Sequence, residues 1–234
     1  GDVYKRQVLI SKLPIANWVE SAVNWLTTTL SGFFNVIQDG GTHLMNGITN
    51  GLTAMPSWMV IIGLTVFAIL VCGKKWGFPL FTFLGLLLIA NQNLWLDLMS
   101  TFTLVLVSSL VSIIIGVPLG IWMAKKETVA KIVQPVLDFM QTMPGFVYLI
   151  PAVAFFGIGV VPGVFASVIF ALPPTVRMSN LGIRQVPKDL VEAADSYGST
   201  PKQKLFKLEL PLATNTILAG VNQTIMLALS LIHI

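Results

Sequence analysis

Charged side chains are so unevenly spaced along this chain of 234 residues that several long segments contain none. A helix needs about 20 mostly apolar residues to cross the hydrocarbon core of a membrane. Only 10% of the residues are charged and 55% are hydrophobic, whereas a soluble domain has about a quarter charged residues. The mean hydropathy of +0.82 agrees with this balance. We therefore expect an all-α fold, a polytopic bundle of membrane helices in the cell (cytoplasmic) membrane.

The uncharged segments predict about six membrane spans. The segment between Asp138 and Arg177 is too long for one span and is interrupted by Gly and Pro at 157–163, so it is divided in two. The first two spans are short and fit either a tilted pair or a re-entrant hairpin. The predicted spans are Ser57–Cys72, Trp76–Ala90, Leu98–Ala124, Phe139–Phe156, Val164–Val176 and Leu212–Leu231.

Lysine and arginine divide the loops into two sets. One set, which includes 177–209, carries eleven of them, and the other set, Asn91–Asp97 and Gly157–Gly163, carries none. Because basic residues are retained on the cytoplasmic side, the loop Arg177–Glu209 is predicted to be cytoplasmic. The residues before Ser57 are then external.

The region before the first span has helical periodicity over Ile15–Ile37, with polar residues between the apolar ones. Such a helix can lie in the membrane interface with Trp18 and Trp25 at the depth of the lipid headgroups, or it can pack on the bundle. Gly40–Gly51, rich in Gly and Asn, is predicted to be a linker. We accordingly group 13–56 as an external helix and linker, 57–97 as a first hairpin, and 98–230 as the core domain.

Uncharged polar side chains in the predicted spans are candidates for a solute path, because polar groups are costly at membrane depth. Hydrogen bonding between helices is the alternative. These path candidates are Gln141, Thr142, Asn222 and Gln223. Small residues at Gly116 and Gly120 favour close helix packing, and with Pro118 they also suit a gate.

No cluster of residues suited to catalysis is visible in the sequence, and one cysteine and two histidines favour no metal site. The spans also contain no Asp, Glu, Lys or Arg near their centres, which disfavours an ion-coupled carrier. We expect a transport subunit and no enzyme.

The loop 177–211 is predicted to form two short helices. Pro187 suits a first helical position, and Gly198 is expected to end the first helix. Thr200 and Gln203 have the spacing of a capping box at the start of the second helix, which is expected to end at Pro211. A solvated loop is the plain alternative. The mixed charges and the membrane anchors disfavour a DNA-binding element, so no nucleic-acid partner is expected.

This loop resembles the EAA loop of ABC importer permeases, whose pattern is E-A-A, three residues, G, nine residues and I-x-L-P. Leu208 in place of isoleucine is the one departure. In that family the loop carries a coupling helix that docks on a cytoplasmic ATPase, which uses ATP and Mg, so the resemblance implies no cofactor bound by this chain. The residues that match are Glu192, Ala193, Ala194, Gly198, Leu208, Leu210 and Pro211.

The likeness extends to glycine betaine/proline-type permeases over roughly Leu9 to Ser230, in the stretches 140–149, 158–164, 171–177 and 219–230. It implies the transmembrane domain of a type I ABC importer, present as two copies and served by an extracytoplasmic substrate-binding protein. The implied solutes are glycine betaine, proline betaine, carnitine, choline or proline, taken up for osmotic protection.

The alternatives are a stand-alone osmotically gated channel and an ion-coupled secondary carrier. Because the family continues past Ser230, the C-terminal part is expected to be missing, and 1–12 and 231–234 are expected to be foreign residues.

Overall fold

Helices make up almost all of the chain in the computed structural model, which describes residues 15–73 and 76–232. The described residues contain no strand, and the all-α prediction is confirmed. Of the expected foreign ends, 1–12 and 233–234 lie outside the described residues, and 231 and 232 end a helix. The helices are α1 (Ile15–Thr29), α2 (Ser31–Thr53), α3 (Ser57–Cys72), α4 (Gly77–Asn91), α5 (Trp95–Lys125), α6 (Glu127–Thr142), the 3₁₀ helix η2 (Gly145–Tyr148), α7 (Leu149–Phe156), α8 (Val160–Arg184), α9 (Lys188–Ser196), α10 (Pro201–Lys204), the π-helical turn η3 (Leu205–Glu209) and α11 (Leu210–Ile232).

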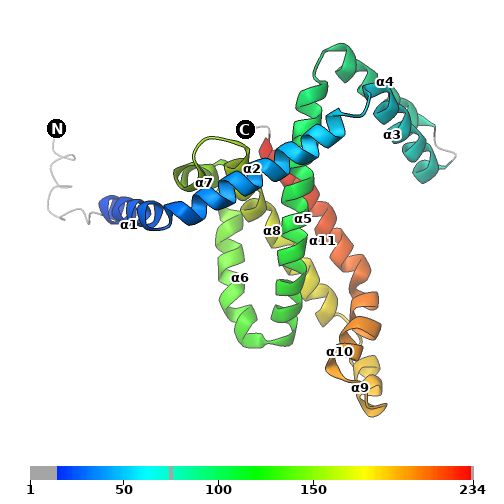
Figure 1. Cartoon of the computed structure of the whole chain (residues 1–234). Coiled ribbons are helices and arrows are strands. Elements are labelled where there is room, and N and C mark those ends of the chain that lie inside the picture. The colour runs from blue at the N-terminus through cyan, green and yellow to red at the C-terminus, as the bar shows by residue number, and fades with distance from the viewer. Residues whose placement is uncertain (1–14, 74–75, 233–234) are drawn as a thin grey trace, which may run out of the picture.

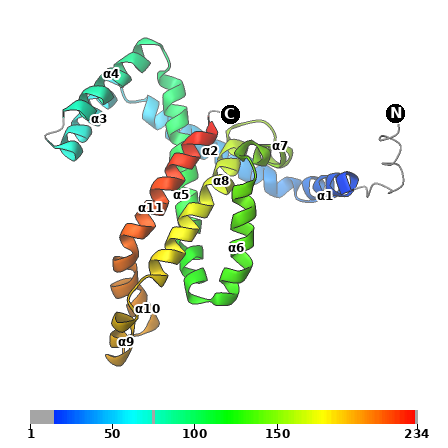
Figure 2. The ribbon, with the colours of Figure 1, turned by 180° about the vertical axis from the view of Figure 1, so that it is seen from behind.

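Three long helices form the centre of the fold, with α8 packed against both α5 and α11 (Figures 1 and 2). Small residues permit this close packing. A Cβ atom on Gly116 of α5 would lie 2.9 Å from the Thr175 side chain, and one on Gly220 of α11 would lie 2.6 Å from the Met178 Cβ. Large apolar side chains such as Ile114 remain exposed. This arrangement suits a membrane, where lipid is as apolar as leucine and helices associate through close contact of small residues.

Helix α6 packs beside this centre and then breaks. Its Leu137 is buried against Met123 of α5 and Val176 of α8. Past Pro144 the chain bends by 108° into η2 and α7. The predicted span Phe139–Phe156 is therefore not one continuous helix, because Pro144 disfavours a helical conformation in the residue before it. The helix begins earlier than predicted, and its charged residues Glu127, Lys131 and Asp138 are exposed.

The N-terminal region is helical almost throughout. The predicted helix Ile15–Ile37 is divided at Leu30, and the predicted linker Gly40–Gly51 lies inside α2. Packing explains the second error. Phe34 stacks on Phe155 with ring centroids 5.0 Å apart, and Thr49 donates a hydrogen bond to Thr103 at 3.1 Å. Such tertiary contacts override the weak helix propensity of glycine and asparagine.

Helices α3 and α4 form a hairpin that projects from one end of α5 (Figure 1). The boundaries of α3 agree with the predicted span, and those of α4 differ from the predicted Trp76–Ala90 by one residue at each end. Both helices expose apolar side chains on several faces. A hairpin of this kind is stable only in contact with lipid or with another apolar surface.

Within the described residues, three helical segments can cross a membrane by length and composition: Trp95–Lys125, Val160–Arg184 and Pro201–Ser230. The number rises to five if each of two bent pairs, α2 with α3 and α6 with η2–α7, counts as one span. About six spans were predicted, and the apolar helix that this criterion leaves out is α4. Helix α4 has 15 residues. At 1.5 Å per residue it is about 22 Å long, less than the thickness of the hydrocarbon core.

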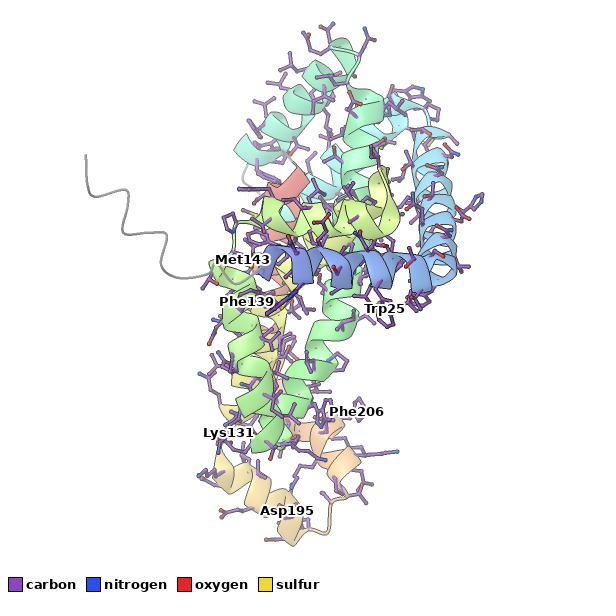
Figure 3. All side chains as sticks on the ribbon, turned by 90° about the vertical axis from the view of Figure 1, so that its left-hand side faces the viewer. Trp25, Lys131, Phe139, Met143, Asp195 and Phe206 are labelled. Atoms are coloured by element: carbon purple, nitrogen blue, oxygen red, sulfur yellow. The ribbon has the colours of Figure 1, made fainter. Side chains whose placement is uncertain are left out.

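Basic and acidic side chains pair along α6, whose start lies toward the end of the molecule opposite the α3–α4 hairpin. Figure 3 shows Lys131 and Asp195 toward this end and Met143 toward the other end of α6. Arg177 lies 2.5 Å from Asp138, and Arg184 lies 3.4 Å from Glu127. Because these pairs hold the charged last turns of α8 against α6, the helix continues well past Val176, where the predicted span ended.

Candidate functional site

The segment after α8 folds as a helical hairpin. Pro187 was predicted to be the first residue of α9, but it is the N-cap. The predicted end at Gly198 is confirmed, because Gly198 has φ +74°, in the left-handed region that favours glycine. Its N–H donates to the Asp195 carbonyl at 2.9 Å, and the Ser199 N–H donates to that of Ala194 at 3.0 Å. These bonds satisfy carbonyls that would otherwise lack partners at the helix end.

The predicted capping box at Thr200 is confirmed. The Gln203 N–H donates to Thr200 Oγ1 at 3.3 Å, and the Thr200 N–H donates to Gln203 Oε1 at 2.9 Å. Both bonds satisfy donors at the helix start. Asp195 of α9 also pairs with Lys204 of α10 at 2.7 Å, which ties the two arms of the hairpin together.

The second arm of the hairpin continues directly into α11. The segment Pro201–Ser230 is one unbroken run of helix, so the expected end at Pro211 is wrong. The chain passes this point through the π-helical turn η3. Pro211 has no N–H for the Lys207 carbonyl four residues before it, and this favours an irregular turn here over a regular one.

The residues that match the EAA pattern lie along this hairpin. Glu192 and Ala193 are on the exposed surface of α9. Ala194, Gly198 and Leu208 line one open hollow of about 430 Å³ between the arms. Leu210 and Pro211 are in the first turn of α11. The hairpin projects beyond the other helices (Figure 1), so its surface is accessible to a partner.

Exposed apolar side chains accompany this surface. Leu190 is 44% exposed and Tyr197 is 91% exposed. A tyrosine this exposed beside small residues is typical of an interface that is open in the isolated chain.

Three of the four path candidates meet at one cavity. Gln141 of α6 and the neighbouring Asn222 and Gln223 of α11 line a hollow of about 410 Å³. Its other lining residues are Pro174, Met226 and Leu227. Thr142 is not in the lining, and its hydroxyl donates to the Phe139 carbonyl at 2.9 Å. A hollow with a few amides among apolar groups has the composition of a small-molecule site.

Gly116 and Gly120 of α5 both face α8, while Pro118 lies on the exposed side of the same helix. The close packing accounts for both glycines. A gating role stays a prediction.

Two polar contacts were missed by the sequence analysis. Lys125 of α5 forms an ion pair with Glu209, whose side chain is 5% exposed. Thr175 and Thr224, both fully buried, share a hydrogen bond of 2.6 Å. A lone carboxylate between Leu208 and Leu210 was the available signal for the first contact. The second has no signal in one sequence, because it depends on the register between α8 and α11.

In the described part of the chain, no group of three or more His, Cys, Asp or Glu side chains could hold a metal ion. The geometry thus offers an exposed helical hairpin at one end and, among the helices, an open and largely apolar hollow with three amide side chains in its lining.

Comparison with known proteins identifies a family for this architecture. Residues 116–232, which include the last part of α5 and all of α8 and α11, match the family described as "Binding-protein-dependent transport system inner membrane component". The chain is 58% identical over 231 residues to the glycine betaine/carnitine transport permease protein GbuB of Listeria monocytogenes, covering 96% of this chain and 80% of that protein.

It is 52% identical over 225 residues to the glycine betaine transport system permease protein OpuAB of Bacillus subtilis, covering 96% of this chain and 79% of that protein. It is 46% identical over 222 residues to the glycine betaine/proline betaine transport system permease protein ProW of Escherichia coli, covering 95% of this chain and 62% of that protein. Because the similarity runs through the central helices and nearly the whole chain, the chain belongs to the inner-membrane permease family of binding-protein-dependent ABC transporters.

Proposed function

We propose that this chain is the membrane subunit of an ATP-driven importer of compatible solutes, in which α9 docks on a cytoplasmic ATPase. The carrying observation is the continuity of the helix Pro201–Ser230. One end of this helix packs with α9, and its middle presents Asn222 and Gln223 to the cavity. A push on α9 is therefore passed along this helix to a wall of the cavity.

The exposed face of α9 supports the docking step. Ala193 and Ala194 let another backbone approach closely, and Tyr197 offers a large exposed ring for burial in a partner. Gly198 keeps the end of the helix narrow. In this proposal ATP and Mg are bound by the ATPase, the chain itself carries no catalytic residue, and two copies of the chain frame the solute path.

The composition of the cavity supports a small solute without strong net charge. The described lining offers three amide side chains and no charged group, so it can hydrogen-bond a carboxylate without holding it as tightly as a lysine or arginine would. The names of GbuB, OpuAB and ProW all include glycine betaine. We therefore propose glycine betaine or a closely related betaine as the solute, delivered by an extracytoplasmic binding protein.

The test is uptake of labelled glycine betaine at high osmolarity. The host would lack other osmolyte importers and would express this permease with its ATPase and binding protein. Uptake that disappears when the ATPase is inactivated is the expected result. Flux that persists without ATP would identify a channel, and flux driven by an imposed ion gradient would identify a secondary carrier. An assembled, ATP-hydrolysing complex that does not import glycine betaine would overturn the assignment of the solute alone.

A further inference from the structure

A buried ion pair joins the last turn of α5 to the base of α11. Lys125 Nζ donates to both carboxylate oxygens of Glu209, at 2.5 Å each. The Glu209 side chain is 5% exposed, whereas that of Lys125 is 40% exposed. A carboxylate removed from water to this degree needs a charged or hydrogen-bonding partner, and the partner here comes from a different helix. The pair thus adds a charged link to the packing of α11 against α5.

The π-helical turn η3 ends at Glu209 and sets the direction of the α9–α10 hairpin relative to this contact. The Leu210 N–H donates to the Leu205 carbonyl, five residues back and not four. The extra residue turns everything before it by about 100° relative to α11, compared with a regular helix. Glu209 is the last residue of this turn. A regular helix through the same point would change the direction of the α9–α10 hairpin relative to the contact with Lys125.

The helical run Pro201–Ser230 carries a second ion pair, five residues before Glu209. Lys204 of α10 pairs with Asp195 of α9, with 18% of the lysine side chain exposed. The two pairs together link α9 to α10, and the base of α11 to α5. Helix α5 in turn packs closely on α8 at Gly120. The α9–α10 hairpin is therefore attached to the central helices where Glu209 contacts Lys125 of α5.

We propose that Lys125 and Glu209 are positioning residues of the transport cycle. They hold α5 to the base of α11, so that a displacement of α9 moves both helices together and is not absorbed by bending at η3. This inference rests on the proposed function, because it concerns how an ATPase would drive the spans.

The experiment is a measurement of ATP hydrolysed per solute imported, made on the complete complex in proteoliposomes. This ratio refers only to assembled complexes, so a smaller yield of folded protein does not change it. For Glu209→Gln we expect hydrolysis to continue while uptake falls, so that the ratio rises about threefold or more. Lys125→Gln, at the half-exposed partner, should raise the ratio similarly without burying a new group. Lys125→Arg should keep the wild-type ratio.

Asp138→Asn is the matched control, because it breaks another ion pair between helices, Arg177–Asp138, which joins α8 to α6 without involving α11. It should leave the ratio unchanged. A double variant, Lys125→Gln with Glu209→Gln, should be no worse than either single variant, because the two residues act as one contact.

Wild-type stoichiometry in both Glu209→Gln and Lys125→Gln would overturn the inference, as would an equal rise in Asp138→Asn. If the wild-type complex itself imports without ATP, the proposed function fails first. The two failures are therefore distinguishable.

Discussion

Gly120 of α5 and Ser179 of α8 are so close that a Cβ atom on Gly120 would lie 2.5 Å from the Ser179 Cβ. It would also lie 2.5 Å from the carbonyl oxygen of Val176. Neither neighbour is the end of a flexible side chain, so one helix would have to move. Gly120→Ala is therefore expected to destabilise the fold by about 1–3 kcal/mol. Thermal unfolding of the purified, detergent-solubilised protein measures this loss.

Gly63→Ala in α3 is the control for the change of Gly120. A Cβ atom on Gly63 meets no atom within 4 Å, so alanine there should leave the unfolding temperature unchanged or slightly raised through its better helix propensity. Equal unfolding temperatures for wild type and Gly120→Ala would contradict the close packing of α5 on α8.

The long apolar helices were predictable because a single property, length without charge, decides them. Ser57–Cys72 agrees with the structure at both ends, and Leu98–Ala124 and Leu212–Leu231 lie inside α5 and α11. The same criterion placed α6 wrongly, because Glu127 and Asp138 interrupt its apolar pattern. Its buried face at Val133, Leu137 and Met140 repeats at helical spacing, which is a signal that charge counting does not detect.

Local sequence predicted the turn of the hairpin but not its connection to α11. The capping residues Thr200 and Gln203 and the glycine at 198 act over three or four residues, so their spacing is sufficient. The Lys125–Glu209 pair depends on the position of α5, 84 residues away in sequence. That Gln141 and Asn222 line the same cavity likewise depends on helix packing, which one sequence does not specify.

Two substitutions of Gly198 distinguish the effect of backbone strain from the effect of blocked docking. Its φ of +74° is costly for any residue with a Cβ, and no neighbouring atom lies within 4 Å. Gly198→Ala should therefore cost about 1 kcal/mol locally and reduce uptake only in part. Gly198→Asp adds charge and bulk at the proposed docking surface and should abolish uptake while membrane insertion is preserved. Uptake in whole cells, with the amount of permease in the membrane measured in parallel, tests both.

Gly73→Asp is the matched control for this series. Gly73 also has a positive φ, +57°, and no described atom within 4 Å, but it lies at the end of α3, away from the α9–α10 hairpin. We expect uptake in Gly73→Asp to remain near the wild-type level. A loss as complete as that of Gly198→Asp would mean that any acidic residue at such a turn is harmful, and the docking argument would lose its support.

Thr224 supports α8 where two prolines weaken it. Pro173 and Pro174 have no N–H, so the carbonyls four residues before them lack helical donors. In the same turn the Thr224 hydroxyl donates to the Ala171 carbonyl at 2.8 Å. Thr224→Val should lower the free energy of unfolding by about 1 kcal/mol, a typical value for a hydrogen bond between membrane helices. Denaturant unfolding in detergent measures this change.

Thr214→Val is the comparison on the same helix, because the exposed Thr214 hydroxyl bonds only to the Leu210 carbonyl of its own helix, at 2.8 Å. Its unfolding free energy should stay near that of the wild type. If both valine variants unfold alike, the contact between α11 and α8 contributes nothing measurable.

Asn222 offers the sharpest test of the cavity as a solute path. If its amide hydrogen-bonds the passing solute, Asn222→Ala removes about 1 kcal/mol of binding and should raise the KM for uptake about fivefold. Asn215→Ala is its matched control, since Asn215 is exposed two turns earlier on the same helix and is not in the lining of the cavity. The KM for glycine betaine, measured with saturating binding protein, should change only in the first variant. Equal KM values in wild type and Asn222→Ala would place the solute path elsewhere and leave the amides as contacts between helices.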